Sequence, residues 1–140
     1  MTKVYLVALD SSVRAPEVLA RAVTLAQGTG AKLVLLRAVG LPSDLPVEAY
    51  AMSPDDVIGV VEQRAKTELA DLAKNIPAGV VYETVVTIGG PWQSICETAS
   101  RVAAELIILG SHGYSGLDKL LGTTASRVVN HADRSVLVVR

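Results

Sequence analysis

The sequence predicts an α/β domain with a parallel sheet, and two observations carry this prediction. Short, continuously apolar runs recur along the chain, and longer segments with helical spacing of apolar residues separate them. Strands that are apolar throughout are typical of parallel sheets covered by helices on both faces. The alternation runs through residues 1–140 without repeat or linker, which predicts a single domain with a three-layer open-sandwich, Rossmann-like fold around a five-stranded sheet.

The first half of the chain predicts two strands and two helices. The run at residues 4–9 is the first strand, and Asp10-Ser11-Ser12 follows it as a turn and N-cap cluster. A helix is expected over residues 13–27, ended by Gly28 and Gly30, before a second strand over residues 32–38. Residues 39–54 hold three prolines and predict a long loop, after which a helix runs from Asp55 to about Asn75.

The second half continues the alternation. Residues 80–88 alternate in polarity, which favours a strand near an edge of the sheet. Gly89-Gly90-Pro91 opens the next helix, and residues 106–109 form a fourth strand. A last helix ending near His131 and a strand over residues 135–139 complete the pattern.

Three unusual positions are expected to meet at one edge of the sheet. Asp10, Ala38 and Gly110 stand at the carboxyl ends of the first, second and fourth strands. Ligands of open α/β sheets bind beyond these ends, where the strand order reverses. The convergence predicts a binding site there more strongly than any one motif does.

A glycine-rich segment predicts that the ligand carries phosphate. Gly110-Ser111-His112-Gly113 follows a strand, and Gly122-Thr123-Thr124 opens a helix eight residues later. Backbone N–H groups at a positive helix end bind phosphate, and glycine permits close approach. No lysine follows the second glycine cluster, so this is neither a P-loop nor the GxGxxG motif. The alternative is structural: a tight turn at Gly110 and Gly113, with Thr123 capping the helix.

With these residues the chain resembles the universal stress proteins of the adenine-nucleotide-binding kind, over essentially its whole length. The family pattern is Gly-x2-Gly-x9-Gly-Ser/Thr, and this chain has it with a spacer one residue shorter, between Gly113 and Gly122. The resemblance implies the strand order 3-2-1-4-5 and an adenine facing the backbone of Ala38. It also implies an antiparallel homodimer formed through residues 136–139.

Asp10 and His112 each have two interpretations. Asp10 contacts the ribose hydroxyls or Mg²⁺, or else it caps the first helix. His112 supports the loop or lies over the nucleotide, and a role as general base is less favoured. No base, lysine or arginine is placed to stabilise a transferring phosphoryl group, so we assign no catalytic residue and expect at most slow hydrolysis. Lys119 is interpreted as a solvated loop residue.

Composition narrows the remaining classes. The formal net charge is −1 and the basic residues are scattered, which favours neither nucleic acid nor a membrane surface as partner. The single cysteine, Cys96, falls on a helix and is expected to be an inert packing residue, and no metal-ligand cluster is seen. The chain starts directly with a strand-like run, which predicts a cytoplasmic protein.

The sequence therefore predicts an ATP-binding regulatory module of the stress response, with or without Mg²⁺, that acts as a homodimer on an unidentified protein partner. Two other classes stay open. One is a nucleotide-free dimerisation module of the same fold, favoured by the short spacer and the small Ala38. The other is a weak ATPase or nucleotidyl transferase.

Overall fold

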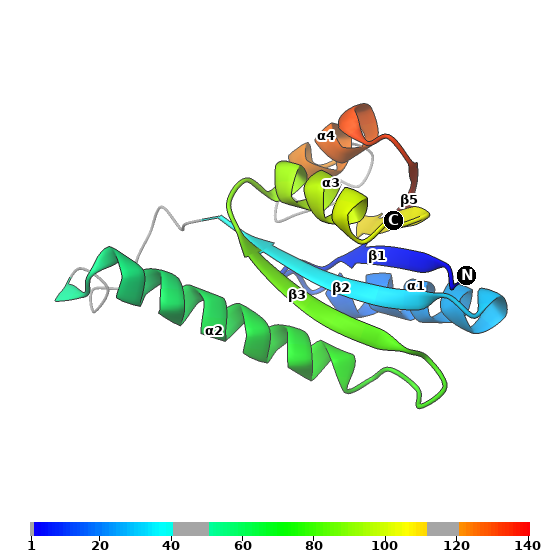
Figure 1. The fold of residues 1–140 in the computed structure, drawn as a ribbon, viewed down its shortest axis with the longest axis horizontal. Helices are drawn as coiled ribbons and strands as arrows, with labels where there is room; N and C mark the ends of the chain where they lie inside the picture. Colours follow the sequence, from blue (N-terminus) through cyan, green and yellow to red (C-terminus); the bar gives the residue numbers. More distant parts are fainter. Residues whose placement is uncertain (1, 41–50, 112–120) are drawn as a thin grey trace.

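A computed structural model describes residues 2–40, 51–111 and 121–140 of the chain. Its sheet has five strands in the order β3-β2-β1-β4-β5, and the neighbouring strands pair in parallel, as predicted (Figure 1). The strands are β1 (Val4–Ala8), β2 (Lys32–Val39), β3 (Tyr82–Ile88), β4 (Leu106–Gly110) and β5 (Ser135–Val139).

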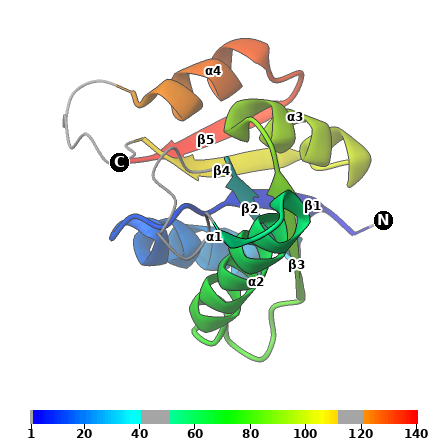
Figure 2. The same ribbon diagram turned by 90° about the vertical axis from the view of Figure 1, so that its left-hand side faces the viewer.

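Four helices complete the three layers. They are α1 (Ala15–Thr29), α2 (Pro54–Ala73), α3 (Pro91–Arg101) and α4 (Thr123–His131). Helices α1 and α2 cover one face of the sheet, and α3 and α4 cover the other (Figure 2). The three-layer sandwich predicted from the alternation of apolar runs is confirmed.

The central strands are apolar throughout because both of their faces are buried. On β1, Tyr5 and Val7 pack in the core beneath α1 and α2, whereas Leu6 packs in the core beneath α3 and α4. On β2, Leu35 and Leu36 divide between the two cores in the same way. Alternate side chains of a strand point to opposite faces, so two buried faces require a continuous apolar run.

Local sequence explains where most helices begin and end. Gly30 ends α1 in the left-handed conformation, with a φ of 75° that glycine adopts without strain. Gly90 and Pro91 open α3, as predicted. Three expected boundaries were wrong. α1 begins at Ala15 rather than Val13, because the segment before it forms a turn, and it continues through Gly28 to Thr29. β3 begins at Tyr82 rather than Val80.

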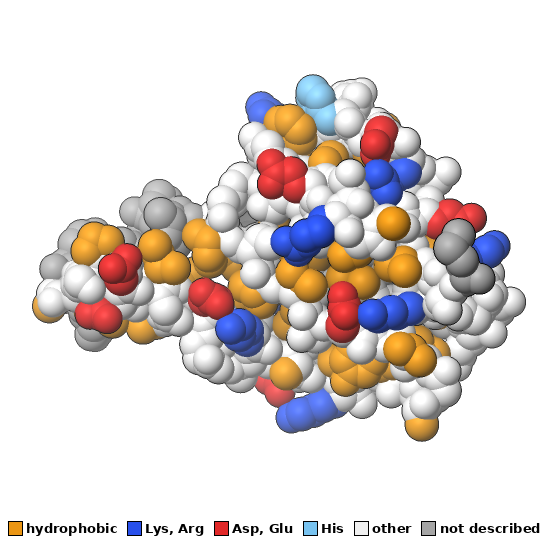
Figure 3. Space-filling view, in the orientation of Figure 1, with side chains coloured by type: hydrophobic (Ala, Val, Ile, Leu, Met, Phe, Trp, Pro, Cys, Tyr) orange, Lys and Arg blue, Asp and Glu red, His pale blue; other side chains and the backbone are white. Residues whose placement is uncertain are grey.

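The two edges of the sheet differ in composition. β3 is an edge strand, as its mixed polarity predicted, and Tyr82 at its start is exposed together with the preceding Val81. Figure 3 shows hydrophobic side chains lying among charged ones on this side of the molecule. Helix α2 extends past the end of the sheet (Figure 1). At the opposite edge, β5 has Leu137 on its exposed side.

Candidate functional site

A cavity of about 690 Å³ opens at the carboxyl ends of β1, β2 and β4, where the predicted site was expected. This size is within the range of small-molecule pockets. Six of the eight residues that the sequence analysis selected line it: Asp10, Ala38, Gly110, Gly122, Thr123 and Thr124. The other two, His112 and Gly113, lie outside the described residues, as does Lys119.

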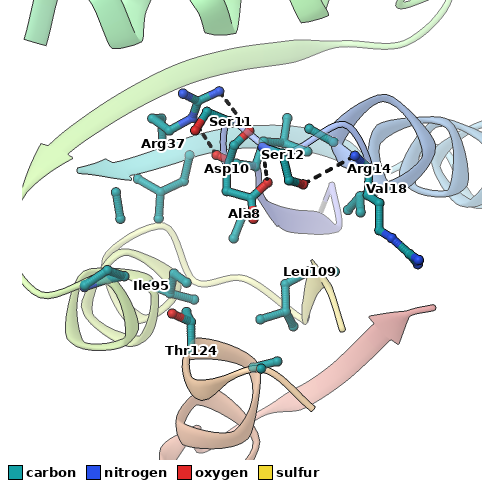
Figure 4. Close-up of a pocket in the computed structure, with 18 of the residues that line it drawn as sticks. Ala8, Asp10, Ser11, Ser12, Arg14, Val18, Arg37, Ile95, Leu109 and Thr124 are labelled. Atoms are coloured by element: carbon teal, nitrogen blue, oxygen red, sulfur yellow. Dashed lines mark hydrogen bonds between the residues drawn. The ribbon is translucent and has the colours of Figure 1, made fainter. Parts of the chain in front are cut away.

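One wall of the cavity is the turn between β1 and α1. The Asp10 carboxylate accepts a hydrogen bond from the Ser12 N–H at 2.9 Å, and the Ser12 hydroxyl accepts one from the Arg14 N–H at 3.3 Å. Figure 4 shows Asp10 and Ser12 on one side of the cavity, with Ile95, Leu109 and Thr124 across from them. Asp10 therefore shapes the turn and does not cap α1, whose N-cap position is Arg14.

Arg37 holds this turn through two backbone carbonyls. Its side chain is almost fully buried, with 6% of the residue's surface exposed, and its Nε donates to the Leu9 carbonyl at 2.7 Å. One terminal nitrogen donates to the Asp10 carbonyl at 3.0 Å, and the other pairs with Glu68 of α2 at 2.6 Å. The hydrogen bond from Arg37 is the main reason that the pKa of Glu68 lies below its ordinary value; Arg64 lowers it further.

The opposite wall joins β4 to α4 and is built from backbone. The buried Ser111 donates its N–H to the Val139 carbonyl at 2.8 Å and accepts from the Gly122 N–H at 2.6 Å. Gly122 occupies the N-cap position of α4, and its carbonyl accepts the first helical bond, from Ser126. Thr123 is thus the first helical residue and not the cap. The N–H groups at the start of such a helix have no partner within the helix.

The rest of the lining is largely apolar. Ala38 and Val39 come from the end of β2, and Pro91 and Ile95 come from the start of α3. The cavity therefore has an apolar part at β2 and α3 and a polar part between the two walls. Such a division suits a ligand that combines a flat, weakly polar ring with a charged group.

Two cations at the cavity, Arg14 and Arg37, were not predicted as site residues from the sequence. Arg37 lies within an apolar strand run, and its only signal was that a charge in such a run must find buried partners. Arg14 precedes a helix start and had no pattern to mark it.

Other expected residues lie away from the cavity. The ring of His131 stacks on Trp92, with centroids 4.4 Å apart, which joins the end of α4 to the start of α3. Cys96 is half-buried, and burial raises the pKa of its thiol, in keeping with an unreactive packing residue. Across the described residues, no group of three or more His, Cys, Asp or Glu side chains is placed to hold a metal ion. Within the same residues, no helix is both long and apolar enough to cross a membrane.

Sheet order, a cavity at the strand ends and a glycine-opened helix define an open α/β protein with a small-molecule pocket at the carboxyl edge of its sheet. The chain matches the universal stress protein family over residues 1–140, and it belongs to that family. A universal stress protein of Synechocystis is 32% identical over 148 aligned residues, which cover 96% of this chain and 96% of that protein.

Solved structures agree on the fold. A universal stress protein of Methanocaldococcus jannaschii superposes with a TM-score of 0.83 at 21% identity, covering 99% of this chain and 96% of that one. A universal stress protein solved in complex with cAMP has a TM-score of 0.67 at 24% identity, covering 99% and 97%. One from Archaeoglobus fulgidus solved with dAMP has a TM-score of 0.62 at 17% identity, covering 100% and 98%.

Proposed function

We propose that this chain binds an adenine nucleotide, with ATP as the preferred ligand, and acts as a nucleotide-dependent regulatory module of the stress response in the cytoplasm. The observation that carries the proposal is that one cavity is lined by Asp10, Ala38, Gly110, Gly122 and Thr123. Family membership supports it, since two universal stress proteins of the same fold were solved with cAMP and with dAMP.

In this proposal the base occupies the apolar part of the cavity, beside the backbone of Ala38. The ribose hydroxyls face the Asp10 carboxylate, and the phosphates lie at the start of α4. There the N–H groups after Gly122 and the hydroxyls of Thr123 and Thr124 donate to phosphate oxygens. His112 and Gly113, which lie outside the described residues, remain candidates for further phosphate contacts from the sequence pattern alone, and Arg14 adds a positive charge. If Mg²⁺ accompanies the nucleotide, Asp10 is the carboxylate that would hold it, because among the described lining residues it is the only one.

Hydrolysis is slow at most under this proposal. Among the described residues that line the cavity, Asp10 is the only one of the usual general-base types, and in this proposal its carboxylate binds the Ser12 N–H and faces the ribose rather than the terminal phosphate. ATP then acts as a conformational ligand, and it shifts the protein only as far as its affinity differs between conformations.

We also propose that the protein forms a homodimer through β5, residues 136–139. β5 lies at an edge of the sheet, and Leu137 is exposed there. An edge strand with apolar side chains favours pairing with another chain. Sedimentation at micromolar concentration tests this: a dimer is expected for the wild type, and a monomer for Leu137→Lys.

Titration calorimetry with ATP and AMP tests the nucleotide proposal. Binding is expected for both, with ATP tighter because its additional phosphates meet more N–H donors. The absence of binding heat at millimolar ATP would contradict the proposal and favour the nucleotide-free dimerisation module. Adenine absorbance released on heating the purified protein would support it directly.

The enzymatic alternative makes a different prediction. A true ATPase or nucleotidyl transferase would show turnover well above background, and Asp10→Ala would abolish that turnover. Binding without such turnover is the result expected here.

A further inference from the structure

We propose that Arg37 is a positioning residue of the nucleotide site. It fixes the β1–α1 turn so that the Asp10 carboxylate faces the ribose. Glu68 of α2 fixes the orientation of the Arg37 side chain. The ribose part of this inference rests on the proposed function, but the part about the turn does not. It follows from three hydrogen bonds that one buried guanidinium makes.

The position of the carbonyl groups explains why the turn needs such a residue. β1 ends at Ala8, and the next N–H, that of Leu9, still donates to the Leu36 carbonyl at 2.9 Å. Beyond this point the chain leaves the sheet, so the carbonyls of Leu9 and Asp10 no longer face a neighbouring strand. Arg37 supplies donors to both, at 2.7 and 3.0 Å. The bond to the Leu9 carbonyl is buried, where a carbonyl left without a donor is costly, and the partly buried bond to the Asp10 carbonyl adds a second anchor, so together they favour one conformation of the turn.

The side chain of Asp10 points away from these bonds and toward the cavity. Its carbonyl accepts a hydrogen bond from Arg37, while its carboxylate accepts one from the Ser12 N–H (Figure 4). These two contacts fix the backbone carbonyl and the side-chain carboxylate of Asp10. A change at Arg37 therefore alters where the carboxylate lies, although Arg37 is expected to make no contact with the ribose.

Glu68 sets the direction of the guanidinium. Its carboxylate bonds Arg37 at 2.6 Å through one oxygen and Arg64 at 3.1 Å through the other. The planar guanidinium can then present two parallel donors to the two carbonyls, which a lysine ammonium does not do with the same geometry. Glu68 thus links the exposed Arg64 on α2 to Arg37, and Arg37 bonds the β1–α1 turn of the site.

The first test uses the protein without nucleotide. Hydrogen exchange is followed in wild type, Arg37→Lys, Arg37→Met and Glu68→Gln. We expect the peptide covering residues 9–14 to exchange at least about tenfold faster in both Arg37 variants and to a smaller extent in Glu68→Gln. Glu83→Gln is the matched control, because it breaks an ion pair with Lys32 at the far end of β2, 2.9 Å in length. Unchanged exchange in Arg37→Lys and Arg37→Met would overturn the inference.

The second test reads the ribose. Wild type is expected to bind ATP about tenfold more tightly than ATP that lacks both ribose hydroxyls. This affinity ratio should fall toward one in Arg37→Lys and in Asp10→Asn. The double variant should show no further fall. Glu83→Gln should keep the ratio of the wild type. A full ratio in Arg37→Lys, or additive losses in the double variant, would refute the inference. A wild type that binds no nucleotide would refute the proposed function alone, because the exchange experiment still decides the role of Arg37 in the turn.

Discussion

The two walls of the cavity are built by different means. The β1–α1 wall is held by side chains: Arg37 bonds the carbonyls of Leu9 and Asp10, and Asp10 and Ser12 bond the following N–H groups. In the β4–α4 wall, backbone groups make the bonds from Ser111 to Val139 and from Gly122 to Ser111. The geometry of the first wall depends on the polar side chains that are present. The second wall has glycine at positions 110 and 122, so access to its backbone depends on the absence of a side chain there.

This difference predicts how each wall responds to substitution. Conservative changes that remove one polar group should weaken the β1–α1 wall, because its geometry rests on those groups. The β4–α4 wall should tolerate the loss of a hydroxyl and fail when bulk is added. Substitutions at each wall test that division.

The largest effect is expected from Gly122→Val. Gly122 has a φ of −62° and a ψ of 163°, an extended conformation open to any residue, so the fold should remain. The added branched side chain would stand where Gly122 lines the cavity and block the approach of phosphate to the helix N-terminus. We expect ATP binding to weaken at least 100-fold, or about 2.7 kcal/mol by calorimetry.

Gly59→Ala is the matched glycine control. Gly59 lies inside α2, and a Cβ there meets open space. Alanine in a helix interior stabilises by about 0.5–1 kcal/mol relative to glycine, so the melting temperature should rise while ATP affinity stays unchanged. Wild-type ATP affinity in Gly122→Val would show that phosphate does not lie at this wall.

A smaller effect is expected from Asp10→Asn. The amide oxygen of asparagine can still accept from the Ser12 N–H, so the turn is kept while the charge is lost. We expect about tenfold weaker ATP binding, near 1.4 kcal/mol, with an unchanged melting temperature. Asp10→Ala loses the turn bond as well and should bind more weakly still. Equal affinities for Asp10→Asn and wild type would remove Asp10 from the site.

The order of the elements and the edge that holds the cavity could be predicted from sequence because both follow from periodicity. Apolar runs such as that of β1 reflect burial on two faces, and parallel strands bring Asp10, Ala38 and Gly110 to one edge. The strand order came from the family resemblance and not from the pattern, since each strand looks alike locally.

The hydrogen-bond partners of Arg37 could not be predicted from the sequence, because they are distant along the chain. Arg37 bonds residues 28 and 31 positions away in the chain, and no local pattern names them. The start of α1 was misplaced for a related reason. Asp10, Ser11 and Ser12 are residue types that favour both helix caps and turns, and here the Asp10 carboxylate bonds its own turn.

The hydroxyls of the β4–α4 wall should matter less than its backbone. Thr123→Val and Thr124→Val keep the shape of each side chain and remove one donor. We expect each to weaken ATP binding about threefold to fivefold, below 1 kcal/mol, because the helix N–H groups remain. A loss as large as that of Gly122→Val would show that hydroxyls, and not backbone, make this wall.

The smallest effect should appear in acid, and only on the β1–α1 wall. The pKa of Glu68 is lower in the folded protein than in the unfolded chain, because its charged form is bonded by Arg37. The stabilisation that the charged Glu68 contributes is therefore complete above the pKa of Glu68 in the unfolded chain, about 4.3. It is lost as the pH falls through the pKa of Glu68 in the folded protein. Glu68→Gln lacks this titration, so the difference in unfolding free energy between wild type and variant should shrink as the solution is acidified.

The size of that difference should not exceed about 1 kcal/mol, because the Glu68 side chain is 36% exposed and water screens the pair. Urea unfolding of both proteins between pH 7 and pH 3 measures it. The protection of residues 9–14 against hydrogen exchange, after correction for the intrinsic pH dependence of amide exchange, should fall over the same range. The cavity residues described for the β4–α4 wall carry no group that titrates there, so the backbone of that wall should keep its protection. An equal loss of protection at both walls would mean that they are one cooperative unit, and the division drawn between them would fail.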